Sequence, residues 1–154
     1  MNVDNRKKHE RALWDKLASS YDANVMDTFG EAYRLTQEAV LEEVNARSRV
    51  LEVGCGTGII SLAIAPQAGE VVGVDLSPAM VALAEEKAQN KGFHNLTFRE
   101  ADAYQLPFED ESFEVILLTN LLHVVADPSS VLREAHRVLV PNGVLATVTD
   151  CMAE

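Results

Sequence analysis

The sequence is poor in cysteine, in long hydrophobic runs and in positive charge. Its two cysteines, Cys55 and Cys151, are too few for a disulfide framework, and their spacing matches no metal-ligand pattern. No apolar run approaches the roughly 20 residues that a membrane-spanning helix needs. The first ten residues are polar and charged, which argues against a secretory signal. We therefore expect a cytoplasmic protein without a membrane span.

The shortage of positive charge excludes another group of functions. Lysine and arginine number 13 against 24 aspartates and glutamates, which leaves a net charge of -11. Stable binding to nucleic acid or to an anionic membrane requires a basic face, so neither partner is expected, although an acidic protein can still carry a local basic patch. The composition, 47% hydrophobic and 24% charged, is typical of a globular protein, and 154 residues suffice for one domain.

Two helical stretches open the chain. The first runs from about Asn5 to Ser20 and carries apolar residues at helical spacing, namely Leu13, Trp14, Leu17, Ala18 and Tyr21. The second runs from about Gly30 to Asn45, with Leu35, Ala39 and Val40 expected to face inward. Both precede the first strand signal, so residues 1–46 are expected to form a helical cap on a core of residues 47–154.

From Arg49 onward, short apolar runs alternate with helical segments. The runs are Val50–Val53, Val71–Val74, Leu96–Phe98, Val115–Leu118 and Val144–Val148. The helical segments are Gly58–Ala65, Pro78–Asn90 and Pro128–Val138. Ser77 and Asp127 each stand as an N-cap before a proline, and Gly92 is placed to end the middle helix. This alternation predicts an α/β fold with a doubly wound, mostly parallel sheet.

The strongest motif is the glycine-rich segment Val50–Gly58, V-L-E-V-G-C-G-T-G, between a strand and a helix. Glycine lets the backbone turn tightly and lets a ligand approach, and the helix start offers free N–H groups. A tight turn without a ligand is the alternative. Asp75 ends the second strand, where a carboxylate can accept both hydroxyls of a ribose. It could instead be a solvated strand end or a helix cap, but Ser77 is the better cap.

The glycine spacing separates two kinds of cofactor site. A dinucleotide fingerprint, G-x-G-x-x-G, would need a third glycine at Ile59, whereas the chain has G-x-G-x-G ending at Gly58. Glu52 stands two residues before Gly54. Three further features accompany this motif: Asp75, Asp102 in E-A-D-A-Y-Q-L-P-F, and residues 117–123 (L-L-T-N-L-L-H). Together the four features resemble the class I S-adenosylmethionine-dependent methyltransferases. The resemblance extends from about residue 14 to residue 150, closest to the ubiquinone-menaquinone C-methyltransferase branch.

The resemblance implies roles for individual residues. Gly54 and Gly56 cradle the methionine part of S-adenosylmethionine, and Glu52 attracts its ammonium group. Cys55 and Gly58 belong to the same cofactor-binding turn. Asp75 holds the ribose. The remaining cofactor residues implied are Tyr21, Leu76, Met80, Asp102, Ala103 and Asn120, of which Leu76 and Met80 flank the adenine ring and Asp102 and Ala103 lie at its edge. Tyr21 matches an aromatic residue of the cap, and a core aromatic is an equal alternative.

Methyl transfer from a sulfonium needs alignment and exclusion of water, and a general base only where the acceptor must lose a proton. His123, just past the fourth strand, is the candidate base, with a partly buried packing histidine as the alternative; His94 and His136 are expected at the surface. Thr119 to Leu122 stand where nucleobase amino-methylating members carry an Asn/Asp-Pro-Pro-aromatic motif. Metal-dependent members have acidic residues after the fourth strand and an Asp-Asn pair after the fifth, where this chain has Thr119–Asn120 and Asp150–Cys151. We therefore expect a small-molecule acceptor, S-adenosylhomocysteine as the product and no metal.

The chain stops at Glu154, before the helix and the strand pair with which the family's sheet continues. A truncated chain, a complementing partner chain and a reduced protein all fit this ending. Two hypotheses therefore stand: an active small-molecule methyltransferase, and a cofactor-binding module that is not catalytic alone. An uncovered fifth strand would favour a homodimer formed near Leu145 to Thr149.

Overall fold

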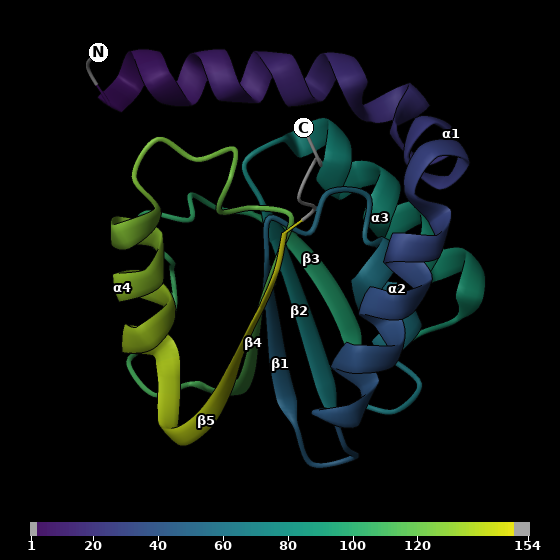
Figure 1. Cartoon of the computed structure of the whole chain (residues 1–154), viewed down its shortest axis with the longest axis vertical. Coiled ribbons are helices and arrows are strands. Elements are labelled where there is room, and N and C mark those ends of the chain that lie inside the picture. The colour runs from purple at the N-terminus through teal and green to yellow at the C-terminus, as the bar shows by residue number, and fades with distance from the viewer. Residues whose placement is uncertain (1–2, 150–154) are drawn as a thin grey trace.

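The computed structural model describes residues 3–149. Its elements, in chain order, are α1 (Val3–Glu42), β1 (Arg49–Val53), α2 (Ile59–Ile64), β2 (Glu70–Asp75), α3 (Pro78–Lys91), β3 (Leu96–Glu100), β4 (Phe113–Thr119), α4 (Pro128–Val138) and β5 (Leu139–Val148). The five strands form one sheet in the order β3-β2-β1-β4-β5, and every neighbouring pair is parallel (Figure 1). The predicted doubly wound α/β fold is confirmed. The strand order reverses between β1 and β4, which is where such sheets bind ligands.

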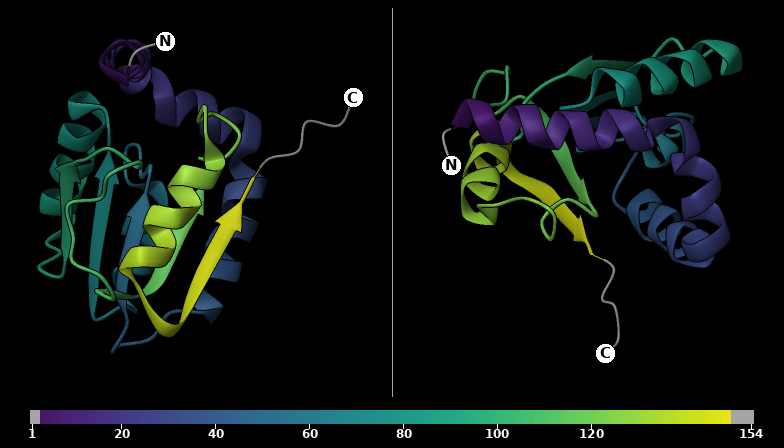
Figure 2. Two further views of the ribbon diagram at one scale, coloured as in Figure 1. Left: turned by 90° about the vertical axis from the view of Figure 1, so that its left-hand side faces the viewer. Right: turned by 90° about the horizontal axis from the view of Figure 1, so that it is seen from above.

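The strands read as continuous apolar runs because helices cover both faces of the sheet. Val50 and its neighbour Leu51 point to opposite faces and belong to separate buried clusters. One cluster packs α1, α2 and α3 against the sheet, and the other packs α4 against it (Figure 2). Val115 and Ile116 of β4 divide in the same way, with relative exposures of 2% and 0%. The sheet is therefore a rigid base for the loops at the carboxyl ends of its strands.

The predicted helix signals of α3 and α4 are confirmed. Ser77 caps α3 by accepting a hydrogen bond from the Met80 N–H at 3.1 Å, and Asp127 caps α4 through the Ser130 N–H at 3.2 Å. Gly92 ends α3 in the left-handed conformation, with φ of 70°. These caps determine where both helices begin and where α3 ends.

The N-terminal segment differs from the prediction of two separate helices. It forms the single helix α1, which bends so that its N-terminal half lies across the carboxyl ends of the strands (Figures 1 and 2). Leu35 and Ala39, expected inside, are exposed, as is Leu13 of the first stretch. Val40 is buried as predicted, and Tyr33 and Val44 are buried on the same side of the helix. Both sides of α1 carry apolar residues, so the periodicity did not identify the side that docks on the sheet.

Strand β5 begins five residues earlier than predicted and follows α4 without a connecting loop. Its register shifts between Phe113, which pairs with Leu139, and Val115, which pairs with Val144. The irregular stretch contains Asn142, with φ of 64°, followed by Gly143. Within residues 3–149, β5 is an edge strand with one neighbour, β4. No helix of this range is both long and apolar enough to cross a membrane.

Candidate functional site

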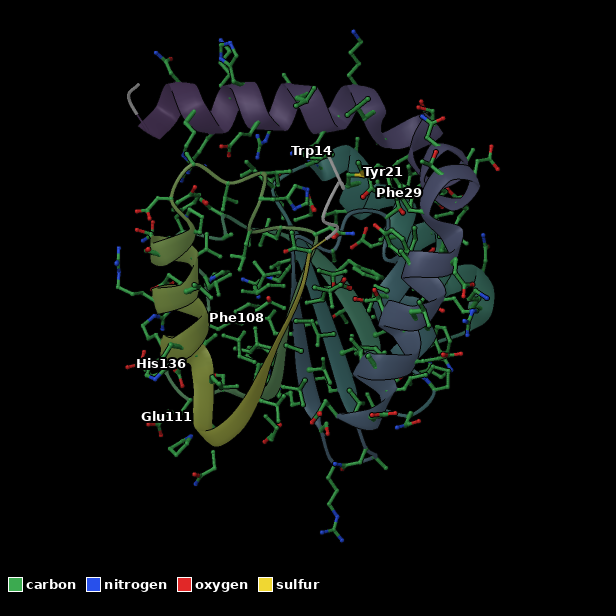
Figure 3. The ribbon with its side chains drawn as sticks, viewed as in Figure 1. Trp14, Tyr21, Phe29, Phe108, Glu111 and His136 are labelled. Atoms are coloured by element: carbon green, nitrogen blue, oxygen red, sulfur yellow. The ribbon has the colours of Figure 1, made fainter. Side chains whose placement is uncertain are left out.

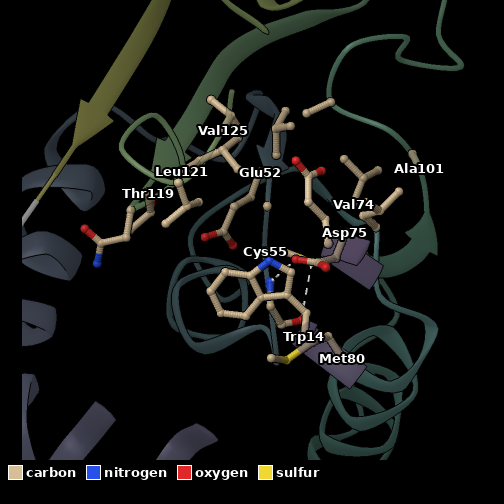
Figure 4. Close-up of a pocket in the computed structure, with 18 of the residues that line it drawn as sticks. Trp14, Glu52, Cys55, Val74, Asp75, Met80, Ala101, Thr119, Leu121 and Val125 are labelled. Atoms are coloured by element: carbon tan, nitrogen blue, oxygen red, sulfur yellow. Dashed lines mark hydrogen bonds between the residues drawn. The ribbon is translucent and has the colours of Figure 1, made fainter. Parts of the chain in front are cut away.

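A pocket opens at the carboxyl ends of β1 to β4, beneath the N-terminal half of α1 (Figure 4). All the cofactor residues predicted from the sequence line it except Gly58. These are Tyr21, Glu52, Gly54, Cys55, Gly56, Asp75, Leu76, Met80, Asp102, Ala103 and Asn120. Residues from four strand ends and the cap thus meet in one cavity, although they are spread over a hundred positions of the sequence.

The glycine turn after β1 is held in a shape that other residues adopt with difficulty. Gly54 and Gly56 have φ of 74° and 52°, in the left-handed region. The N–H groups of Gly54 and Cys55 both donate to the Val74 carbonyl, at 2.8 and 3.0 Å, which fixes the turn to the end of β2. A Cβ at Gly56 would meet only the Tyr21 ring, at 3.8 Å. The backbone at Gly56 can therefore be approached closely by a ligand.

Gly58 has a different role from the one predicted. It does not line the pocket, and it is the N-cap of α2 with φ of 80°. A Cβ there would lie 2.7 Å from Phe98 Cζ and 3.1 Å from Ala84 Cβ. The third glycine of the motif is therefore required because α2 starts against β3 and α3, and its expected contact with a cofactor is corrected to a packing role.

Asp75 stands at the tip of β2 with its carboxylate turned to the glycine turn. It accepts hydrogen bonds from the Gly56 N–H and the Ser77 N–H, each at 2.9 Å. Burial raises its pKa above the usual range, against the lowering effect of these backbone donors. The cap of α3 is Ser77, so the alternative that Asp75 caps this helix is wrong. A partly buried carboxylate thus lies in the pocket against the glycine turn.

Glu52 is a second carboxylate of the pocket and is 2% exposed. The Ser61 N–H and the Ser61 hydroxyl donate to it at 3.0 and 2.5 Å. Burial raises the pKa of Glu52 to about 7, because the Ser61 hydrogen bonds only partly offset the loss of water and the negative charge of Asp75 raises it further. The negative charge of Asp75 makes ionisation of Glu52 less favourable. This part of the pocket is therefore suited to bind a cationic group.

Asp102, after β3, is engaged by the N-terminal turns of α1. Lys7 Nζ lies 2.8 Å and an Arg6 guanidinium nitrogen 3.3 Å from its carboxylate, which also accepts the Tyr104 N–H at 3.0 Å. Burial raises the pKa of Asp102, but these donors, Lys7 first, bring it below its usual value. The Arg6 guanidinium stacks over the Tyr104 ring at 4.0 Å. Arg6 therefore closes this end of the pocket.

Aromatic residues of α1 cover the centre of the pocket. The Trp14 and Tyr21 rings meet edge to face with centroids 6.4 Å apart, and both lie below α1 in Figure 3. The Tyr21 hydroxyl is 3.3 Å from that of Tyr33, and burial raises the pKa of Tyr21, so its phenol stays protonated. Sequence analysis missed Trp14 and Tyr33 as pocket residues. The two-turn spacing of Trp14 and Tyr21 was a usable signal for Trp14.

The N-terminal half of α1, residues 3–24, is tied to the core by polar contacts, and we call it the lid. Asp22 accepts hydrogen bonds from the Thr57 hydroxyl and from Lys87, which also donates to the Thr57 carbonyl at 2.9 Å. Asp15 accepts from the Ser77 hydroxyl at 2.5 Å. The contacts join the lid to the glycine turn and to the start of α3, which both border the pocket.

His123 is not brought to the pocket. It is exposed and absent from the lining, in contrast to the general-base role predicted from its position after β4. The chain leaves β4 through Asn120, which has φ of 51° and donates its N–H to the Val148 carbonyl at 2.7 Å. This turn directs Asn120, Leu121, Val124 and Val125 into the pocket and leaves His123 outside.

The other predicted residues are placed as follows. His94 and His136 are exposed, as expected, and His136 lies on the outer side of α4 (Figure 3). Cys55 is buried, and burial raises the pKa of its thiol, so it is a small, unreactive side chain of the turn. In the part of the chain that the structure describes, no three His, Cys, Asp or Glu residues lie together as a metal site would require.

Comparison with known proteins agrees with this geometry. The model of the methyltransferase domain family matches residues 51–147. An uncharacterised methyltransferase of Bacillus subtilis, YcgJ, is 40% identical over 101 residues, covering 66% of this chain and 40% of YcgJ. The crystal structure of YcgJ superposes with a TM-score of 0.73 at 35% identity, covering 75% of this chain and 50% of that one.

Two further proteins extend the comparison. A demethylmenaquinone methyltransferase of Thermus thermophilus is 36% identical over 140 residues, which cover 88% of this chain and 63% of that enzyme. The solved complex between the Haloferax volcanii Trm112 methyltransferase activator and a methyltransferase gives a TM-score of 0.75 at 27% identity, with 87% of this chain and 58% of that chain covered. The chain thus spans 40% to 63% of the length of the two curated relatives named here.

Proposed function

Because the chain belongs to the methyltransferase domain family, we propose that it binds S-adenosylmethionine and transfers the methyl group to a small-molecule acceptor. One observation carries the proposal: Glu52, Asp75 and Asp102, which follow one another along the ends of β1, β2 and β3, all line a single pocket. S-adenosylmethionine has three hydrogen-bond donors that suit acidic partners: its ammonium group, its ribose hydroxyls and its adenine amino group. They follow one another along the cofactor in the order in which Glu52, Asp75 and Asp102 follow one another along the strand ends.

The pocket residues fit each part of the cofactor. The open backbone at Gly56 and the raised pKa of buried Glu52 suit the methionine end, where the ammonium group would favour ionised Glu52. The Asp75 carboxylate would accept the ribose hydroxyls. Leu76 and Met80 supply apolar surface for the flat adenine ring, and Asp102 would accept its amino group. Of the described residues that line the pocket, the ionisable ones beside the glycine turn are the acids Glu52 and Asp75, which would repel the pyrophosphate of a dinucleotide.

When bound, the cofactor, held by Glu52, Asp75 and Asp102, would supply a methyl group activated by positive sulfur for in-line displacement by an electron pair of the acceptor, and would leave as S-adenosylhomocysteine. The protein's contribution is alignment and exclusion of water. Trp14, Tyr21 and Tyr33 of α1 shield the pocket, and the Asp22 contacts hold the lid over it. His123 is exposed, so we assign it no proton transfer.

A cofactor-binding module that needs a partner is the second candidate. It is favoured by the likeness to a chain of the complex with the Trm112 activator. The relative named for demethylmenaquinone, a small molecule, supports the first candidate.

Calorimetry with S-adenosylmethionine, S-adenosylhomocysteine and NAD tests cofactor identity. We expect both adenosyl compounds to bind and NAD to give no response, and tight NAD binding without a response to the other two would overturn the proposal. Methyl transfer from labelled cofactor to a panel of small acceptors then separates the candidates. Cofactor binding without transfer to any acceptor would favour the partner-dependent module.

A further inference from the structure

The glutamate near the end of β1 is held from behind by a serine of α2. Glu52 Oε2 accepts the Ser61 N–H at 3.0 Å and the Ser61 hydroxyl at 2.5 Å. Ser61 has no exposed surface and does not line the pocket, whereas Glu52 does line it. Both hydrogen bonds therefore reach the carboxylate from the side of the protein core, and Ser61 does not itself meet a ligand in the pocket.

The second carboxylate oxygen of Glu52 is left for the pocket. Among the described residues, Ser61 is the one whose groups donate to this carboxylate, and both of its bonds go to Oε2. The same part of the chain contains no buried side-chain oxygen that lacks a hydrogen-bond partner, so Oε1 is not sealed in the core. Because Glu52 lines the pocket, Oε1 faces its space. One oxygen is thus anchored on α2, and the other can meet a ligand.

The other surroundings of Glu52 work against its charge. Burial removes water from the carboxylate, and the like charge of Asp75 on β2 adds to this effect, so its pKa is about 7. The remaining titratable side chains on this part of the pocket are the phenols of Tyr21 and Tyr33 on α1 and the thiol of Cys55 in the glycine turn. Burial raises the pKa of Tyr21 and of Cys55, so neither supplies a charge near neutral pH. Glu52 therefore depends on hydrogen-bond donors to hold its negative charge.

We propose that Ser61 is a positioning residue for the ammonium group of the methyl donor, because it anchors one oxygen of Glu52 and so directs the other toward that group. This inference rests on the proposed function. The two Ser61 donors favour the ionised form of the carboxylate, which is the form that attracts a cation. They also fix the orientation of the carboxylate before a ligand arrives, so less side-chain freedom is lost on binding. A residue outside the pocket thus controls both the charge and the direction of this contact.

The test compares two ligands that share adenosine and differ in the ammonium group. S-adenosylhomocysteine carries the amino-acid portion, and 5′-methylthioadenosine lacks it. In calorimetry at pH 7, Ser61→Ala should bind S-adenosylhomocysteine about fivefold more weakly than the unmodified chain does, and should bind 5′-methylthioadenosine equally well. A carboxyl pKa of about 8 in the variant would leave about a tenth of Glu52 ionised at pH 7 in place of about half, which gives this loss. A damaged fold would instead weaken both ligands.

The matched control is Ser48→Ala. Ser48 is also buried and lies outside the pocket lining, and its hydroxyl accepts the Asn45 N–H at 3.0 Å. This variant should change neither affinity. The pH dependence is a second measurement: from pH 6 to 7.5, affinity for S-adenosylhomocysteine should rise as Glu52 ionises, and in Ser61→Ala this rise should move to higher pH. In a Glu52→Gln background, Ser61→Ala should lose most of its effect.

The outcomes are distinguishable. An unchanged affinity of Ser61→Ala for S-adenosylhomocysteine, equal weakening of both ligands, or an equal loss in Ser48→Ala would each overturn the positioning role. An unshifted pH dependence, or a full effect of Ser61→Ala in the Glu52→Gln background, would also overturn it. Failure of the unmodified chain to bind S-adenosylhomocysteine would instead overturn the proposed function itself.

Discussion

Asp75 combines two tasks at the residue scale. Its carboxylate holds the Gly56 and Ser77 N–H groups and is the proposed partner of the ribose hydroxyls. Each charge-assisted hydrogen bond contributes about 1.5–3 kcal/mol before discounting for solvent. Asp75→Ala should therefore weaken S-adenosylmethionine binding at least about tenfold in calorimetry. The control is Asp110→Ala, which removes an exposed carboxylate outside the pocket lining. An unchanged dissociation constant in Asp75→Ala would contradict the proposed contact between Asp75 and the ribose.

Glu52 gives the protein a specific dependence on pH. Its pKa rises from 4.5 to about 7 on folding, so between these values the folded chain keeps a proton that the unfolded chain has lost. The free energy of unfolding should therefore fall as pH rises through this window, by on the order of 3 kcal/mol, and level off above it. In Glu52→Gln, this fall in the free energy of unfolding with rising pH should be absent. Thermal unfolding from pH 4 to 8 checks it.

Glu43→Gln, at an exposed position of the same charge, is the control for that series. The difference curve between the unmodified chain and Glu52→Gln should slope across the window, while that for Glu43→Gln should be flat. A flat curve for both would show that Glu52 ionises normally.

Two glycines with similar backbone angles differ in their surroundings. Gly58 and Gly92 have φ of 80° and 70°, but a Cβ at Gly58 would overlap Phe98 whereas at Gly92 nothing lies within 4 Å. Gly92→Ala should lose about 1 kcal/mol for the left-handed backbone alone. Gly58→Ala should lose a further 1–3 kcal/mol, roughly, for overpacking. Denaturant unfolding measures both, and equal losses would contradict the packing role of Gly58.

Residue types and spacing anticipated the pocket lining because strand ends of a parallel sheet meet at one edge. Asp75 could be found in this way, whereas Glu52 and Asp102 were implied by the resemblance to the methyltransferases. The packing role of Gly58 could not be predicted, because its neighbour Phe98 is forty positions away in the sequence and is not part of the glycine motif. His123 could not either, because the left-handed turn at Asn120 decides which side chains after β4 point inward.

At the scale of elements, the lid depends on polar contacts centred on Asp22. This carboxylate accepts from Thr57 and Lys87, and its side chain is 42% exposed, so water screens the pair to about 1 kcal/mol or less. Asp22→Asn should speed hydrogen exchange of the amides in residues 5–24 and weaken cofactor binding by roughly threefold. Asp27→Asn, on the exposed part of the same helix, should do neither. Unchanged exchange in Asp22→Asn would mean that other contacts hold the lid.

The helices and strands of the core were predictable because each has a local signal. Pro128–Val138 was predicted to the residue from Asp127 and Pro128, and the apolar runs located all five strands. Helix α1 was the exception. Leu13 and Leu35 lie at helical spacing from other apolar residues yet are exposed, because the docking side of a helix is chosen by its neighbours. The bend and the single long helix likewise follow from docking on two surfaces.

At the scale of the whole molecule, β5 has β4 as its one neighbour among the described residues, which leaves an edge with which another chain could pair. Thr147 is exposed there, and the outer N–H and C=O groups of an edge strand invite pairing. We expect the chain as it stands to form a two-fold dimer in light scattering, and Thr147→Lys to shift it toward monomer. Ser129→Lys, exposed on α4, controls for the added charge. A clean monomer of the unmodified chain at high concentration would count against this dimer.

The polar attachment of the lid also has a kinetic consequence. Lifting the lid from a ligand beneath α1 breaks the bonds of Asp15, Asp22 and Asp102 to their partners. The ion pairs of Asp22 with Lys87 and of Asp102 with Lys7 weaken as salt screens them, whereas apolar packing does not weaken in this way. If opening limits the release of product, moderate salt would raise the turnover number while it lowers affinity for the donor. The lid contacts that retain the cofactor would then also limit the rate of turnover.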